Sequence, residues 1–398
     1  LIGEFKKSPI DDYFPWGLPF RVKRYFELQQ GMKSARNSLQ NFHFGAIQLP
    51  GRAEDQEVYV LVIGETGRPD RWRLNGYTRE TNPLLSQQKN FVSFTNVTTG
   101  WAWTRMSVPV MISRKPPQMQ SSFFPEKSIV SVFKEAGFWT AWYSTQGSLG
   151  FHESAVALHA SEANDVQYVN PAGYRSPGVY DGRLLDLLKI ALGRPEKKKF
   201  IVLHTLGGHY NYSHRSPPDF DIFTPVLRNN SSASLHDKKL KQELNNSYDN
   251  SIVYTDFFLN SVVNHLKNNN SLAVLLYAAD HGENIFDGDC DKSGHGHNTE
   301  FDYRISAAWW NSDSFGEKFP AKVAAARAMK NQAWSTQNIF ETLAGAADIE
   351  IANQPRHGAS ILSENFQPMP RWVQSGLLFD QAARTGACKV LTHAPHSS

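Results

Sequence analysis

Three apolar runs, each ending in polar residues that can bind a ligand, constrain the fold of this chain more than any other feature. They occupy residues 58–63, 200–206 and 271–277. Short runs rich in branched apolar residues are typical of strands buried on both faces of a parallel sheet. Residues 240–267 carry apolar side chains at helical spacing, as a helix connecting such strands would. The sequence therefore predicts an α/β fold with a mostly parallel sheet.

A candidate ligand follows the end of each run. Glu65 follows the first run, His209 follows the second, and Asp280 and His281 follow the third. Gly282 comes next and lets the backbone turn away without a side-chain clash. Because the carboxyl ends of parallel strands share one edge of the sheet, we expect these side chains to meet there.

A hydroxyl group joins this set from residues 98–109, which follow a strand-like segment at 91–97. Thr104 would lie at the start of a helix, where free N–H groups favour an anion. A simple capping role for Thr98, Thr99 or Thr104 is the alternative. Glu65, Asp280, His281 and Thr104 together would give zinc a tetrahedral set of donors. A nearby cation would make the Thr104 hydroxyl a better nucleophile.

Further histidines follow the Asp280-His281 pair, in the sequence Gly-His-Gly-His. Either His295 or His297 could reach the predicted site, together with His209. Such histidines could hold phosphoryl oxygens, bind a second ion or protonate a leaving alcohol. The spacing alone does not choose between His295 and His297.

Charge and composition limit which classes of function and which cellular compartment the chain can be assigned to. The 41 basic and 38 acidic residues leave a net charge of +3, so nothing in the charge predicts nucleic-acid binding. No apolar run reaches the roughly 18–20 residues of a membrane-spanning helix. The chain begins with Leu, and we expect a targeting portion to be missing. Cys290 and Cys388 could form one disulfide or remain two separate thiols.

The first 50 residues differ from the remainder. Residues 13–26 mix aromatic and basic side chains, a combination that suits a membrane–water interface. An amphipathic helix packed on the body is the alternative. We predict a juxtamembrane linker and interfacial helix over residues 1–50 and a catalytic domain over residues 51–398.

The chain resembles the bacterial phosphoethanolamine transferases that modify lipid A and the lipooligosaccharide core, within the alkaline phosphatase and sulfatase superfamily. The resemblance covers most of residues 58–350, in family order. It is carried by the segments VYVLVIGETGRPDRWRLNGYTRETNP, FTNVTTGWAWTRMSVPVM, VLHTLGGHYNY, NSYDNSIVYTDFFLNSVVNHLK, LLYAADHGENIF and NIFETLAGAADI.

The resemblance implies a three-layer α/β/α sandwich held at the inner membrane, with its catalytic domain in the periplasm. It implies one tightly bound Zn²⁺, with room for a second. By the resemblance the zinc ligands are Glu65, Thr104, Asp280 and His281. Thr104 is also the nucleophile, and His209 and His295 are the active-site histidines, with His297 as the competing choice.

The implied reaction takes phosphoethanolamine from phosphatidylethanolamine, through a phospho-threonine intermediate, to an envelope glycan or glycolipid. We expect a monomer. The alternatives are a phosphodiesterase or sulfatase-type hydrolase, and a binding protein on the same fold.

This chain departs from the best-known lipid A members of the family at two points. Two cysteines allow one disulfide at most, whereas those enzymes carry several. Trp101 and Trp103 stand where those enzymes place small hydroxyl residues beside the nucleophile. The second difference indicates an altered donor or acceptor surface.

Overall fold

The computed structural model describes residues 39–394 apart from 148–153, 172–177, 231, 354–355 and 357, together with isolated positions between 18 and 37. The predicted interfacial helix lies for the most part outside the described residues. The end of the predicted linker is described. There Phe44 is buried, and β1 (Ala46–Gln48) pairs with β12 (Ile349–Ile351). Residues 44–48 therefore pack on the main body of the fold.

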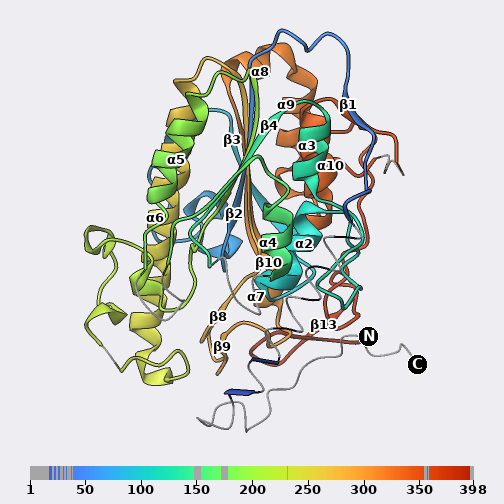
Figure 1. Ribbon diagram of the computed structural model, residues 1–398. Helices are drawn as coiled ribbons and strands as arrows, with labels where there is room; N and C mark the ends of the chain where they lie inside the picture. Colours follow the sequence, from blue (N-terminus) through green and yellow to red (C-terminus); the bar gives the residue numbers. More distant parts are fainter. Residues whose placement is uncertain are drawn as a thin grey trace.

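The core of the molecule is an eight-stranded sheet (Figure 1). In spatial order its strands are β11 (Trp334–Ser335), β3 (Phe91–Thr98), β10 (Arg304–Asn311), β7 (Leu272–Ala279), β2 (Glu57–Gly64), β6 (Lys198–His204), β4 (Trp139–Ser144) and β5 (Asp165–Tyr168). β10 runs antiparallel to both of its neighbours, and the other pairings in this sheet are parallel. The predicted mostly parallel sheet is confirmed.

The central strand β2 shows why its sequence is apolar throughout. Val58 and Val60 pack into one cluster of buried side chains, whereas Tyr59 and Leu61 pack into a second cluster. Successive side chains of a strand point to opposite faces, so a strand covered on both faces needs apolar residues at every position.

Helices cover both faces of the sheet and complete the three-layer sandwich (Figure 1). One layer contains α5 (Arg183–Leu192) and α6 (Lys241–Lys267). The opposite layer contains α2 (Thr104–Ile112), α3 (Ile129–Glu135), α4 (Ser154–Ala160), α8 (Asp313–Lys318), α9 (Pro320–Ala328) and α10 (Ile339–Ala346). In the part of the chain that the structure describes, no helix is both long and apolar enough to cross a bilayer.

Small elements surround the carboxyl edge of the sheet. They are α7 (Glu300–Tyr303), the pair β8 (Asn284–Ile285) and β9 (Ser293–Gly294), and the pair β13 (Ala383–Thr385) and β14 (Val390–Thr392). Beyond residue 353, the described residues form turns and the β13–β14 pair.

Candidate metal and catalytic site

The strand register brings the predicted ligands to one place. In the parallel pair of β2 and β7, Gly64 lies opposite Ala279, so Glu65 and Asp280 leave the sheet side by side. His281 follows directly. Thr104 begins α2, which the chain enters after β3. Gly282 must be small here, because a Cβ on it would lie 1.9 Å from the carbonyl oxygen of Phe301.

Glu65, Asp280 and His281 form a buried group of three. The Nε2 atom of His281 lies 3.3 Å from Oε1 of Glu65 and 3.5 Å from Oδ2 of Asp280. The hydroxyl of Thr104 donates a hydrogen bond to Oε2 of Glu65 at 3.1 Å. All four predicted metal-binding residues are therefore in one cluster.

The unpaired atoms of this cluster suit a cation. Oε1 of Glu65 and Oδ2 of Asp280 are buried and have no hydrogen-bond partner among the described residues. Nδ1 of His281 donates to the carbonyl oxygen of Gly282 at 2.9 Å, so Nε2 is the ring nitrogen that faces the two carboxylates and could bind a metal. Burial of unpaired carboxylate oxygens is costly without a counter-ion, so the donor set fits a divalent metal.

Protonation of the cluster reflects the same crowding. Burial and the adjacent Glu65 carboxylate raise the pKa of Asp280 to about 7. Burial disfavours charge on His281, but Asp280 and Glu65 outweigh it and raise the pKa of the imidazole to about 10. Burial would also raise the pKa of Glu65, yet the neighbouring His281 lowers it below its usual range. Without a cation, protons bound to Asp280 and His281 therefore offset the negative charge of the cluster.

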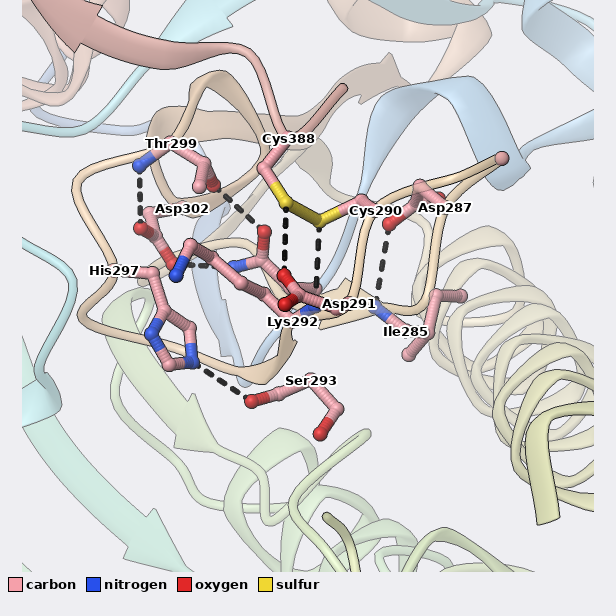
Figure 2. The surroundings of a disulfide bond; sticks show 12 residues. Ile285, Asp287, Cys290, Asp291, Lys292, Ser293, His297, Thr299, Asp302 and Cys388 are labelled. Carbon is pink, nitrogen blue, oxygen red and sulfur yellow. Dashed lines mark hydrogen bonds between the residues drawn. A yellow bond between two sulfur atoms is a disulfide. The ribbon is translucent and has the colours of Figure 1, made fainter. Parts of the chain in front are cut away.

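The structure separates the two competing histidines. The rings of His295 and His281 have centroids 4.3 Å apart, and Nδ1 of His295 lies 2.9 Å from Oε2 of Glu283. His297 instead donates from Nε2 to the carbonyl oxygen of Ser293 at 2.8 Å (Figure 2). His295 therefore lies at the site, whereas His297 supports the loop that carries it.

That loop is attached to the C-terminal region. Cys290 and Cys388 form a disulfide, which resolves the choice that the sequence left open (Figure 2). Beside the disulfide, the backbone amide of Leu391 donates to the carbonyl oxygen of Asn298 at 2.8 Å. The same C-terminal region reaches the loop before Thr104, where Oε1 of Gln374 accepts from the amide of Ala102 at 3.1 Å. The C-terminal region thus braces both loops of the site.

A cavity of about 280 Å³ opens beside this cluster. His209 lines it, with Nδ1 2.7 Å from the carbonyl oxygen of Tyr210. Its other lining residues are Glu65, Trp103, Thr104, Arg105, Gln146, Gly147, Val156, Ala157, Tyr168, His204, His281 and His295.

Sequence reasoning missed three polar residues of the site. Gln146 donates to Oε2 of Glu65 at 3.0 Å, and His204 lines the cavity with both ring nitrogens buried and unpaired among the described residues. Glu283 binds His295 and accepts from the Tyr212 hydroxyl at 2.8 Å. His204 and Gln146 come at or just after the ends of β6 and β4, so their positions at strand ends could have revealed them.

Solved structures share this architecture. The C-terminal periplasmic domain of EptC from Escherichia coli, in complex with zinc, aligns with a TM-score of 0.71 and 23% identity, over 87% of this chain and 94% of that one. A protein of the alkaline phosphatase superfamily from Vibrio parahaemolyticus aligns with a TM-score of 0.52 and 14% identity, over 80% of this chain and 75% of that one. The fold and the edge-of-sheet site therefore define an alkaline-phosphatase-like α/β domain.

The family follows from the sequence. The Sulfatase family model matches residues 57–349, and the chain belongs to the sulfatase family. A Kdo(2)-lipid A phosphoethanolamine 7''-transferase from Escherichia coli K12 is 32% identical over 295 residues, which are 72% of this chain and 49% of that protein. Phosphoethanolamine transferase EptA of the same strain is 28% identical over 73% of this chain and 53% of its own length. The chain thus spans about half the length of these relatives.

Proposed function

We propose that this chain is the catalytic domain of a zinc-dependent phosphoethanolamine transferase. The proposed donor is phosphatidylethanolamine, and the proposed acceptor is an envelope glycan or glycolipid. The relatives named for this activity support the chemistry. One observation carries the proposal: the Thr104 hydroxyl lies 3.1 Å from Glu65, inside a buried donor group that suits zinc.

Glu65, Asp280, His281 and Thr104 are the residues that would hold the ion. A zinc-bound relative of the same fold supports this assignment. Zinc bound there would supply positive charge for the phosphoryl oxygens and for the Thr104 oxygen.

The chain's own residues account for two displacements at one phosphorus. In the first, the Thr104 oxygen forms a bond to phosphorus and the bond from phosphorus to the diacylglycerol oxygen breaks. The Thr104 proton leaves, and the diacylglycerol oxygen gains one. In the second, an acceptor hydroxyl displaces Thr104 and gives up its proton while the threonine oxygen is reprotonated. The start of α2 favours the anionic group bound there.

His295 and His209 are the groups proposed to move these protons. Glu283 holds Nδ1 of His295, which leaves Nε2 for the substrate. Nδ1 of His209 is likewise held by a backbone carbonyl. Both side chains line the same cavity as Thr104.

The proposed donor is a membrane lipid, so the proposal includes attachment of the domain to the inner membrane on its periplasmic side. The EptC domain that shares the fold is described as periplasmic, which supports this location. We propose a monomer and no nucleic-acid partner.

The test is to incubate the zinc-loaded chain with vesicles of headgroup-labelled phosphatidylethanolamine and an envelope glycolipid extract. We expect mass spectrometry to find phosphoethanolamine on the Thr104 peptide and label in the glycolipid. Thr104→Ala should reduce transfer by at least about 10³-fold, whereas Thr104→Ser should retain part of it. Transfer by Thr104→Ala at the unchanged rate would refute the role of Thr104. Label recovered only as free phosphoethanolamine would indicate a hydrolase instead.

A further inference from the structure

Residues of two chemical kinds line the cavity beside Thr104. The histidines, Arg105, Glu65 and Thr104 suit a phosphate. Trp103, Val156, Ala157 and Tyr168 provide apolar and aromatic surface. Phosphoethanolamine has the same division, because its phosphate is separated from an ammonium group by two carbons.

Trp103 is built into the site immediately before the proposed nucleophile. It is the N-cap residue of α2, and its side chain is 38% exposed, although it lines the cavity. The exposed part of the Trp103 indole is available to a ligand. Trp101, by contrast, is buried and donates from Nε1 to the carbonyl oxygen of Pro117.

The indole of Trp103 rests on the loop that carries His295. A Cβ added to Gly296 would lie 2.8 Å from Cζ2 of Trp103, so the ring packs directly on the glycine backbone. Gly296 has φ +86°, a conformation that favours glycine, and its amide donates to Oδ1 of Asp302 at 3.0 Å. The ring is therefore supported by a fixed segment of backbone rather than by mobile side chains.

The charges around the cavity leave few partners for a substrate ammonium. Glu65 is the one carboxylate among its described lining residues, and the metal-binding group uses it. Arg105 also lines the cavity, and its permanently charged guanidinium disfavours a second cation close to it. The face of an aromatic ring attracts a cation through its quadrupole, and indole does so best.

We propose that Trp103 is a specificity-determining residue whose indole face recognises the ammonium group of the ethanolamine headgroup. This inference rests on the proposed function and adds to it the part of the site that selects a cationic donor. Tyr168 lines the same cavity and can supply a second ring.

The experiment compares two chromogenic phosphodiesters with the zinc-loaded chain. One is p-nitrophenyl phosphoethanolamine, and the other is p-nitrophenyl propyl phosphate, in which a methyl group replaces the ammonium. The release of p-nitrophenol reports kcat/KM for the first displacement. We expect the unchanged chain to prefer the ammonium ester by about fivefold to tenfold, the range of one cation–π contact.

Trp103→Leu should abolish this preference, because the lost ring face is the contact that only the ammonium ester makes. Trp103→Phe should retain part of the preference and guards against a folding defect. Ile190→Ser, which changes an exposed apolar residue on α5, is the matched control and should change neither rate.

Failure of this inference differs from failure of the proposed function. If the unchanged chain cleaves both esters equally, or if Trp103→Leu slows both by the same factor, Trp103 does not recognise the ammonium. If the unchanged chain cleaves neither ester and transfers no phosphoethanolamine from vesicles, the proposed function fails and the inference fails with it.

Discussion

Thr104 donates its hydroxyl hydrogen bond to Oε2 of Glu65 at 3.1 Å, across 39 residues of sequence. Glu65 follows β2, and Thr104 begins α2 after β3, so the positions of two different strands set this distance. The fold therefore places a potential nucleophile directly against a potential metal ligand.

Gln146 should control the metal affinity without binding the metal. It donates to Oε2 of Glu65 at 3.0 Å and to the carbonyl oxygen of Thr205 at 2.9 Å, and so fixes the Glu65 carboxylate. Removal of such a supporting hydrogen bond typically weakens metal binding, and we expect Gln146→Ala to lower zinc affinity about tenfold. Competition with a chromophoric chelator measures the zinc affinity of each variant. Gln167→Ala, outside the cavity, is the control, and equal affinities for both variants would contradict the role.

His295 and His297 should differ in their effect on catalysis. His295→Ala removes the ring that lines the cavity and binds Glu283, and we expect transfer to fall about 100-fold, as for loss of a general acid or base. His297→Ala is the matched control, because His297 only supports the loop through Ser293. The rate of transfer to glycolipid measures both. A larger loss for His297→Ala would reverse the assignment.

The disulfide should stabilise the folded chain. Cys290 and Cys388 are 98 residues apart in sequence, and a crosslink across a long loop restricts the unfolded chain. We expect the double variant Cys290→Ser, Cys388→Ser to lose about 2–4 kcal/mol of unfolding free energy in urea. The unchanged chain in dithiothreitol should match the double variant. Identical midpoints with and without reductant would show that the disulfide adds no stability.

Glu341 should make stability depend on pH. Burial raises the pKa of its carboxyl to about 7, against the opposing effect of Arg356 and Arg114, and its Oε1 is unpaired among the described residues. Because the pKa in the folded state lies above the ordinary glutamate value of 4.5, the stability that this carboxyl contributes is present below pH 4.5 and is lost as pH rises through 7.

Urea unfolding at pH 5 and pH 8 tests this. Glu341→Gln should reduce the loss of stability between these pH values by about 1–2 kcal/mol, less than the full shift allows because the side chain is partly exposed. Glu350→Gln, at an exposed position on β12, is the control. An unchanged pH dependence in Glu341→Gln would show that this carboxyl does not titrate as described.

The sequence could predict the layers of the fold because local pattern reflects burial. The apolar run at β2 requires cover on both faces, and helical periodicity at residues 240–267 became α6. The pattern could not show that β10 runs antiparallel, since a buried strand has the same composition in either direction.

For the site, the apolar runs in the sequence were enough to place Glu65, Asp280 and His281 just beyond strand ends. The three side chains could then be expected to meet, because the carboxyl ends of parallel strands converge. The tertiary structure was needed to choose between His295 and His297 and to pair Cys290 with Cys388. It was also needed to show that Gln146 contacts Glu65 and that Glu283 contacts His295. These features depend on the direction that each side chain takes from its loop. That direction is fixed by contacts with distant segments, which no local pattern contains.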